Sequence, residues 1–223
     1  MAPSDSAPSP RSRVRRAPKR GAYDRATIDA ILDEALVCHV GLVDDEGQPY
    51  VIPTLHARIG DWVYIHGSTA SRLVRTLGAG APACLTVTLL DGLVLAKSTF
   101  HHSMNYRSVV LLGRMELVSD IQDRRAALDA FVEQMIPGRT ADARGANAKE
   151  LKATQVLRMD LNEAGAKVRT GPPVDDPADE ALPVWSGVVP LTLLPGEIIG
   201  DPDPPDYVRN WRRETSGRSI TRS

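Results

Sequence analysis

The sequence contains only two cysteines, Cys38 and Cys84, and each lies in an apolar stretch rather than in a CxxC pair. Such sparse, unpaired cysteines indicate buried thiols in a reducing compartment and argue against a disulfide framework. The N-terminus also lacks the apolar core of a secretory signal, and no uninterrupted apolar run is long enough to cross a bilayer. We therefore expect a cytoplasmic protein without a membrane partner.

There is no excess of charge of either sign. Lys and Arg together number 27, and Asp and Glu number 28, so the composition gives no reason to expect nucleic acid or an acidic membrane surface as a partner. The apolar share of 42% is sufficient for a hydrophobic core, and the length suits one large domain with tails. A small molecule or a second copy of the chain is the expected partner.

Several motifs of catalytic and nucleotide-binding sites are missing. The sequence has no GxxxxGK[ST] loop, no GxGxxG fingerprint, no HExxH and no GxSxG elbow, which argues against the protein classes that depend on them. The histidines, His39, His56, His66, His101 and His102, lack zinc-site spacing, so we predict no metal site. A Ser/His/Asp set that meets only in the folded chain stays open.

Composition divides the chain into three parts. Residues 1–21 are rich in Pro, Ser, Ala, Arg and Lys with almost nothing to bury, which predicts a disordered basic tail. This tail is either solvated or in contact with nucleic acid, and we expect the former. Residues 22–200 form the predicted domain, and residues 201–223 form a proline-bearing, extended C-terminal tail.

Within the domain, the spacing of apolar residues predicts many short strands and three helices. The first helix follows Tyr23 with Asp24 as its cap, and the other two cover residues 71–77 and the segment from Ser119 to Pro137. Asp91-Gly92 predicts a tight hairpin. This pattern favours a mainly β protein with helices (α+β), built as an antiparallel barrel rather than a doubly wound sheet. The predicted strands are residues 37–43, 50–58, 62–66, 83–90, 93–99, 106–118, 154–161 and 184–194.

Small residues and hydroxyls gather where one predicted strand ends and a helix begins. The run reads His66-Gly67-Ser68-Thr69-Ala70-Ser71-Arg72. A helix N-terminus exposes unpaired N–H groups and the positive end of the dipole, so it binds phosphate readily, and Arg72 can add a two-pronged contact. The same run also fits an ordinary Ser/Thr cap before an exposed helix.

Four stretches, in this order and spacing, resemble the FMN-binding split barrel of the pyridoxamine 5′-phosphate oxidase superfamily. The resemblance is greatest to its flavin-nucleotide-binding branch, which includes the nitroimidazole-resistance (Nim) proteins. Residues 48–54 resemble the strand that lines the isoalloxazine ring, and residues 64–72 resemble the phosphate-binding strand and helix start. Residues 105–114 resemble the strand that reaches the flavin across a dimer interface. Trp185-Ser186-Gly187 with Pro190 resembles the family's C-terminal Trp-x-Gly-x-x-Pro.

The resemblance implies an antiparallel six-stranded FMN-binding split β-barrel flanked by helices. It also implies a homodimeric flavoprotein with FMN at the interface. The segment from Leu194 to Asp203 lacks the Arg and His that the oxidase itself carries there, so pyridoxamine phosphate oxidation is not expected. The cofactor-binding residues that the resemblance and the helix-end argument together predict are Val51, Ile52, Pro53, Thr54, His66, Gly67, Ser68, Ser71, Arg72, Asn105, Tyr106, Arg107 and Ser108.

The function implied by this resemblance is that of an oxidoreductase. It would take hydride from NADH or NADPH and pass electrons to a small organic acceptor, with His66 as the best candidate for a catalytic proton donor. Arg107 or the Asn105 amide is expected to approach the flavin, while Val109 and Leu111 pack inward. The alternative for Asn105 and Arg107 is a purely structural role, such as a dimer salt bridge.

Two other functions stay open. One is a flavin carrier or sequestration protein with little turnover. The other is a split barrel that binds haem or a deazaflavin in place of FMN. The adjacent His101 and His102 are compatible with haem, although on an extended segment only one of them can face a given pocket.

Overall fold

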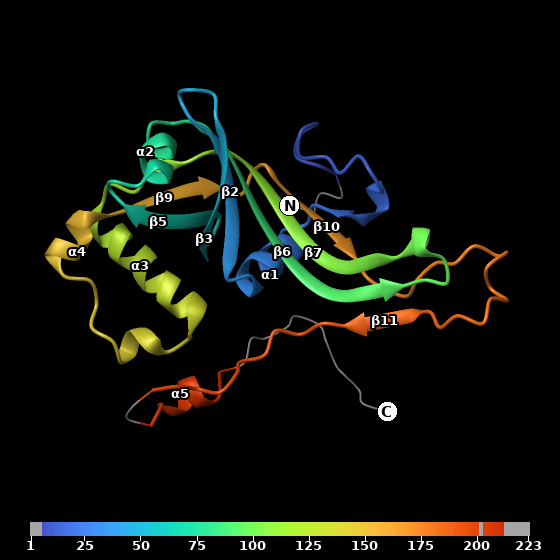
Figure 1. Ribbon diagram of the computed structural model, residues 1–223. Coiled ribbons are helices and arrows are strands. Elements are labelled where there is room, and N and C mark those ends of the chain that lie inside the picture. The colour runs from blue at the N-terminus through green and yellow to red at the C-terminus, as the bar shows by residue number, and fades with distance from the viewer. Residues whose placement is uncertain (1–5, 201–202, 212–223) are drawn as a thin grey trace.

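The structure is a computed structural model that describes residues 6–200 and 203–211, and its strands form two antiparallel sheets (Figure 1). The order in the larger sheet is β1-β10-β7-β6-β2-β3, with β11 paired to β6, and the order in the smaller sheet is β4-β5-β9-β8. The larger sheet contains β1 (Gly21–Ala22), β2 (Val37–Val43), β3 (Pro49–Leu55), β6 (Pro82–Leu95), β7 (Ser103–Arg114), β10 (Ala164–Arg169) and β11 (Gly187–Pro190). The smaller sheet contains β4 (Ala57–Ile59), β5 (Trp62–Ser68), β8 (Glu116–Leu117) and β9 (Thr154–Asp160).

Five α-helices accompany the sheets in the described part of the chain. Figure 1 shows α3 and α4 gathered at one end of the molecule, whereas the long β6 and β7 ribbon extends to the other end. None of these helices is long and apolar enough to cross a membrane. The helices are α1 (Arg25–Glu34), α2 (Arg72–Gly78), α3 (Ile121–Met135), α4 (Ala148–Ala153) and α5 (Asp206–Arg209), with 3-10 turns η1 (Pro18–Arg20), η2 (Thr99–His101) and η3 (Arg139–Ala141).

The main hydrophobic core lies where α1 and α2 pack on the two sheets. On β2, Cys38, Val40 and Leu42 are buried while the residues between them are exposed or half-buried, which is the alternation of a strand with one face on a core. Helix α1 begins at the predicted cap, because the Asp24 carboxylate accepts a hydrogen bond from the Thr27 N–H at 2.8 Å. Full burial of a side chain such as Leu32 contributes about 1.5–3 kcal/mol.

A second, smaller core lies on the opposite face of the smaller sheet. Tyr64 of β5 and Val156 of β9 pack there with Ala127 and Phe131 of α3. The smaller sheet therefore separates α2, which packs on the main core, from α3, which packs on the second core. Each side chain of β5 therefore faces either α2 or α3, depending on the side of the smaller sheet to which it points.

The fold class predicted from the sequence, mainly β with flanking helices in a split-barrel fold, is confirmed. The described residues form eleven strands, whereas the spacing of apolar residues predicted eight. One cause is that predicted strand 50–58 is divided between the two sheets as β3 and β4. Another is the short strand β10, which was not predicted.

The predicted hairpin at Asp91-Gly92 is wrong, because β6 is one continuous strand from Pro82 to Leu95 with a bulge at this point. Strand β7 pairs with β6 on both sides of the bulge, and β11 pairs with residues 92–95. These long-range pairings override the local turn preference of the dipeptide. The cap of α3 was also misplaced by one residue, since Asp120, and not Ser119, accepts from the first-turn N–H groups.

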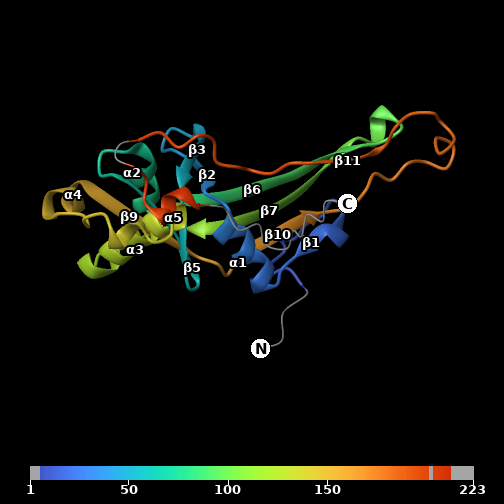
Figure 2. The ribbon, with the colours of Figure 1, turned by 90° about the horizontal axis from the view of Figure 1, so that it is seen from below.

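The chain segments at both ends of the predicted domain have defined contacts. In the segment predicted to be a basic tail, Ser9 donates a hydrogen bond to the Glu163 carboxylate at 2.6 Å, and Gly21–Ala22 pairs with β10. After β11 the chain returns along the molecule to α3 (Figure 2), where the Trp211 indole donates to the Met135 carbonyl at 2.9 Å. Part of the predicted C-terminal tail is therefore helical and docked, while the domain boundaries at 22 and 200 stay predictions.

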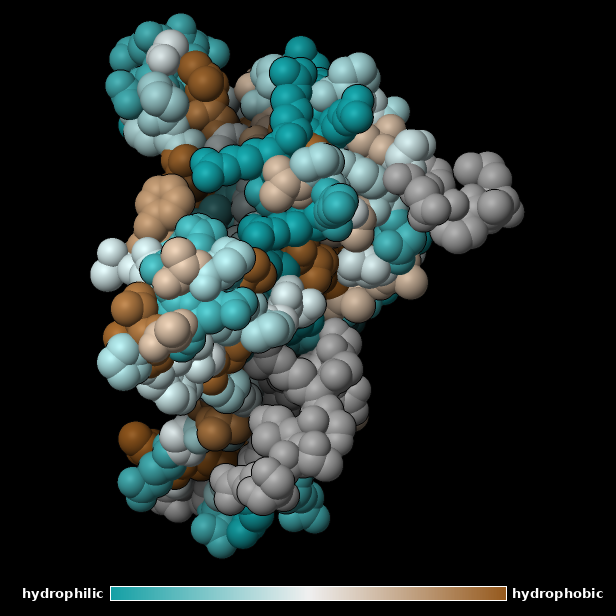
Figure 3. All heavy atoms as spheres, turned by 90° about the vertical axis from the view of Figure 1, so that its right-hand side faces the viewer, coloured by the Kyte–Doolittle hydropathy of each residue, from teal (hydrophilic) through white to brown (hydrophobic). Residues whose placement is uncertain are grey.

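The far end of the β6 and β7 ribbon carries exposed apolar side chains, of which Phe100 is 87% exposed. Val174 and Trp185, on the neighbouring loop, are also exposed. Figure 3 views the molecule from this side and shows hydrophobic side chains in several separate groups among hydrophilic ones. Scattered exposure of this kind is normal for a protein surface and does not define a binding area.

Candidate cofactor site

The predicted phosphate-binding run forms a tight turn between β5 and α2. The Ser71 N–H donates to the Ser68 carbonyl at 2.9 Å, and the Thr69 N–H donates to the Ala153 carbonyl at 3.1 Å. Ser71 is the N-cap of α2, yet its side chain makes no capping hydrogen bond. The first-turn N–H groups of α2 thus have no side-chain cap, which is the arrangement that an anion can complete.

Gly67 and Arg72 connect this turn to its surroundings. A Cβ atom on Gly67 would stand 2.8 Å from Cγ2 of Val74, so α2 packs closely on the strand only because residue 67 is a glycine. The Arg72 guanidinium lies over the Tyr50 ring, 4.3 Å from its centroid, which brings the start of α2 next to β3. Ser68, Ser71 and Arg72 therefore lie together at the start of α2, next to β3, and their role in cofactor binding stays a prediction.

Strand β3 presents its predicted flavin-lining residues on two faces. Val51 is 69% exposed and Pro53 is exposed on the outer face of the larger sheet, while Ile52 and Thr54 are half-buried on the inner face. The outer face continues across the sheet, because Pro53 pairs with His39, His39 with Thr86, and Thr86 with Val110. Tyr50, the residue that Arg72 contacts, lies on the inner face of β3 with Ile52 and Thr54.

His66 belongs to a different environment from the turn. Its ring packs on Phe131 of α3, with 4.4 Å between the ring centroids, on the opposite face of β5 from α2. Its Nδ1 atom is buried and has no hydrogen-bond partner, and burial lowers the pKa of the imidazole. The structure thus separates His66 from Ser71 and Arg72, because successive side chains of a strand point to opposite faces.

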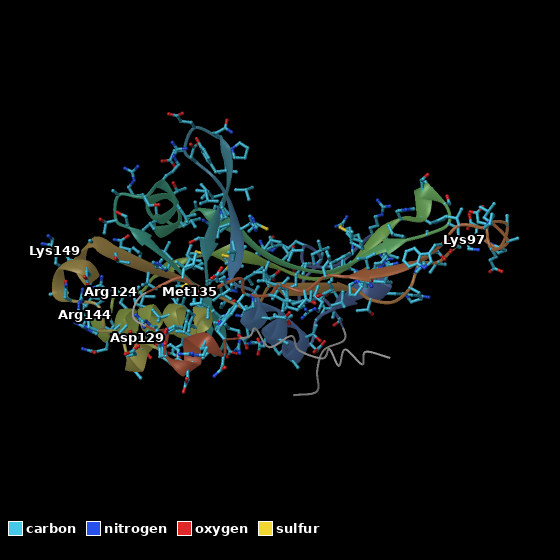
Figure 4. The ribbon with its side chains drawn as sticks, turned by 60° about the horizontal axis from the view of Figure 1, so that its bottom comes forward. Lys97, Arg124, Asp129, Met135, Arg144 and Lys149 are labelled. Carbon is cyan, nitrogen blue, oxygen red and sulfur yellow. The ribbon has the colours of Figure 1, made fainter. Side chains whose placement is uncertain are left out.

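The His66 ring lines a cavity of about 470 Å³ between β5 and the α3–α4 region. Leu55 and four apolar residues of α3 form its walls, and Arg144, paired with Glu150 at 2.7 Å, lies at its edge. Figure 4 shows Asp129 and Met135 on α3 and Arg144 before α4, at the opposite end of the molecule from Lys97. Sequence analysis missed this cavity because its lining runs from residue 55 to residue 154. The four α3 residues are Leu128, Phe131, Val132 and Met135.

Arg107 forms ion pairs inside its own chain, so its predicted contact with a flavin stays a prediction. Its guanidinium donates to the Glu34 carboxylate at 2.5 and 2.7 Å and to the Asp91 carboxylate at 2.9 Å through two nitrogens. These two acids, whose side chains are each 7% exposed, raise the pKa of Arg107. Arg107 faces inward because it shares its strand face with Val109, which was itself predicted to pack inward.

The other predicted residues of β7 also lie away from the turn. The Asn105 amide donates to the Gly171 carbonyl at 3.1 Å, and its oxygen accepts from Arg169. Ser108 donates from its hydroxyl to the Lys167 carbonyl at 3.3 Å, and Tyr106 is half-buried. Within one chain, therefore, none of Asn105, Tyr106, Arg107 and Ser108 is brought to the turn.

The remaining histidines do not assemble into a metal site. His39 lies on the outer sheet face, His101 pairs with Asp176 at 3.1 Å, and His102 Nδ1 lies 2.9 Å from the Ser98 carbonyl. His56 is buried with Nε2 2.9 Å from the Leu32 carbonyl. Over residues 6–200 and 203–211, no group of three or more His, Cys, Asp or Glu side chains is placed to hold a metal ion.

Comparison with known proteins identifies similar chains. A family model described as pyridoxamine 5′-phosphate oxidase matches residues 24–168. The flavocytochrome Anf3 from Azotobacter vinelandii has 44% sequence identity and a TM-score of 0.84, over 94% of this chain and 100% of its own. The FAD and heme binding protein from Mycobacterium smegmatis has 38% identity and a TM-score of 0.77, over 85% of this chain and 96% of its own.

A candidate 5-nitroimidazole antibiotic resistance protein from Bacteroides thetaiotaomicron VPI-5482 is also similar in structure. It has 26% identity and a TM-score of 0.56, and the match covers 66% of this chain and 86% of that protein. No curated protein sequence matches the chain.

Proposed function

The chain belongs to the pyridoxamine 5′-phosphate oxidase family, a flavin-binding family, and on that premise we propose that it is a redox protein that binds a flavin nucleotide and haem. The observation that carries the flavin proposal is the uncapped first turn of α2, held against Gly67 and flanked by Arg72. A flavin phosphate at this turn would receive backbone N–H groups and a guanidinium. The ring would then lie along β3.

We favour FAD over the FMN that the sequence predicted. The two relatives that match most of this chain are a flavocytochrome and an FAD and heme binding protein. The phosphate-binding turn itself fits either nucleotide, since both carry a phosphate next to the ribityl chain. Release of the chromophore by denaturation, followed by mass measurement, decides between FAD and FMN.

The His66 cavity fits a haem group. Its volume lies in the range of cofactor pockets, and its walls are mainly apolar side chains from β3 and α3. Because burial lowers the pKa of His66, this imidazole is neutral at pH 7, as a metal ligand must be. His66 would ligate the haem iron, and Arg144, which lines the same cavity, would offer a positive charge to the haem carboxylates. A bound haem would supply one-electron chemistry.

The purified protein is expected to absorb as a flavohaem protein. Flavin bands near the blue region and a Soret band should both be present, and NADH or NADPH should bleach the flavin bands under anaerobic conditions. Absorption spectra recorded before and after anaerobic titration with NADH or NADPH measure both bands and the bleaching of the flavin bands. A colourless protein that takes up neither added FAD nor FMN would contradict the proposal.

His66→Ala is expected to abolish or shift the Soret band while the flavin bands remain. The reason is that the His66 imidazole would ligate the haem iron, whereas the flavin turn lies on the other face of β5. Absorption spectra of the variant, with and without added imidazole to replace the lost ligand, measure the effect. The matched control is His39→Ala, on the outer sheet face, and an unchanged Soret band in His66→Ala would contradict the assignment.

A flavin carrier is the second candidate function. The position of His66 on the far face of β5 favours it, because the predicted proton donor then does not stand beside the proposed flavin. A carrier would bind flavin with the same turn but would not accept hydride from NADH or NADPH. The anaerobic titration above therefore distinguishes the two functions.

We also propose that the protein is a homodimer that covers the outer face of the larger sheet. Val51 is 69% exposed and Val110 is 39% exposed on this face, and both are β-branched residues that favour burial. Val110→Asp is expected to shift the chain to monomer, measured by sedimentation velocity. The control is Val174→Asp, an exposed position on the loop after β10, and a monomeric unmodified protein would contradict the dimer.

A further inference from the structure

Arg169, the last residue of β10, is a buried cation with no carboxylate partner among the described residues. The residue is 8% exposed. Its guanidinium donates to the Asn105 side-chain oxygen and to the carbonyls of Gly171 and Pro172, the last two at 3.4 and 3.3 Å. Its Nε is buried and has no hydrogen-bond partner. Buried charges are normally paired, so this guanidinium lacks a counter-charge.

Arg107 is a half-buried arginine of the same chain whose charge is compensated, and it serves as a comparison. It lies on the adjacent strand, with a side chain that is 14% exposed, and carboxylates of Glu34 and Asp91 neutralise it from two sides. Arg169 has a comparable degree of burial but no carboxylate contact in the described chain. Neutral oxygens alone can orient a guanidinium, yet they leave its charge uncompensated.

A second cation lies next to Arg169. The pairing of Gly21 with Lys167 places Arg20, which precedes Gly21, beside the end of β10. Burial, and after it the charge of Arg20, lowers the pKa of Arg169. Tyr106 pairs with Arg169 across the β7–β10 ladder and adds a phenol group. Two guanidiniums and one hydroxyl therefore gather at this edge of the larger sheet.

The N-terminal segment contributes a cavity and further arginines close to this edge of the chain. It encloses a cavity of about 870 Å³ whose lining includes Arg13, Arg15 and Tyr23. Pro18 also lines this cavity and begins the 3-10 turn that carries Arg20. Within the described residues neither Arg13 nor Arg15 forms an ion pair, whereas Arg11 pairs with Glu163.

We propose that Arg169 and Arg20 bind the phosphate or diphosphate group of a small molecule, whose organic part would extend toward the N-terminal segment. A phosphate carries close to two negative charges and several acceptor oxygens, so it can compensate both guanidiniums, whereas a carboxylate compensates one. This site lies on β10 and the N-terminal segment, apart from the flavin turn on α2 (Figure 1). Within one chain it shares no residue with the flavin turn or with the His66 cavity.

Isothermal titration of the full chain with inorganic pyrophosphate at constant ionic strength tests the site. We expect saturable binding to the unmodified protein and a Kd raised at least about tenfold in Arg20→Gln, since a charge-assisted hydrogen bond is lost. Arg20 is exposed, so its replacement leaves the fold intact, and Arg16→Gln is the matched control from the same segment. Arg169→Met should abolish binding in any preparation that circular dichroism shows to be folded.

Pyrophosphate titrations of flavin-free and of flavin-saturated protein distinguish two possible sources of the phosphate. If a flavin bound to a second copy supplies it, pyrophosphate binds to the flavin-free protein but not to the flavin-saturated protein. If a separate small molecule supplies it, both preparations bind pyrophosphate equally. The proposal is overturned if the unmodified protein shows no saturable binding, or if Arg20→Gln and Arg16→Gln weaken binding to the same extent.

Discussion

Replacing Arg107 with alanine is expected to lower the free energy of unfolding by about 3–5 kcal/mol. The variant leaves the carboxylates of Glu34 and Asp91 buried without the guanidinium that each contacts in the structure. Urea unfolding followed by circular dichroism measures the effect.

Two further variants show whether this loss is specific to the buried cluster. Arg114→Ala removes an exposed arginine from the same strand and should change the free energy of unfolding by no more than about 0.5 kcal/mol. The triple variant Arg107→Met, Glu34→Gln and Asp91→Asn removes all three charges together and should recover much of the stability. If Arg107→Ala unfolds at the same urea concentration as the unmodified protein, the cluster does not stabilise the fold.

Replacing Arg72 with alanine is expected to raise the Kd for flavin about 10- to 150-fold. This range corresponds to the loss of a charge-assisted hydrogen bond of about 1.5–3 kcal/mol to the phosphate. The exposed contact of Arg72 with the Tyr50 ring should contribute only about 0.5–1 kcal/mol to folding. Titration of flavin into the flavin-free variant, followed by fluorescence, measures the affinity.

Arg75→Ala is the matched control for this experiment. Arg75 is an exposed arginine near the other end of the same short helix, so its replacement removes the same charge away from the N-terminal turn. Its flavin affinity should stay within about twofold of the unmodified protein. Equal affinities in Arg72→Ala and the unmodified protein would remove the turn as the phosphate site.

These expectations depend on the separation of the flavin turn from the His66 cavity. Both are reached from one strand, because Gly67 faces α2 while His66 faces α3. A flavin at the turn and a haem in the cavity would thus stand on the two sides of the smaller sheet within a single domain. That arrangement would allow electron transfer between them without a second domain.

Much of the local structure of this protein could be predicted from its sequence. The helix that begins after Asp24, strand 37–43 and the helix that follows Ser71 depend on side chains within a few residues of one another, so their signals are present in the sequence itself. The same holds for the turn from Gly67 to Arg72, whose small residues and arginine are consecutive. The split-barrel fold followed from the order and spacing of several such stretches.

Only the tertiary structure decided what joins residues far apart in the chain. Asp91-Gly92 has the local chemistry of a hairpin, yet pairing with β7 and β11 makes it a bulge. Arg107 was expected at a cofactor, and Glu34, 73 residues away, pairs with it. The position of Arg169 among neutral oxygens likewise depends on loops folded around it. The physical reason is that a strand sequence fixes which residues share a face, whereas the partner that face meets is set by packing across the whole domain.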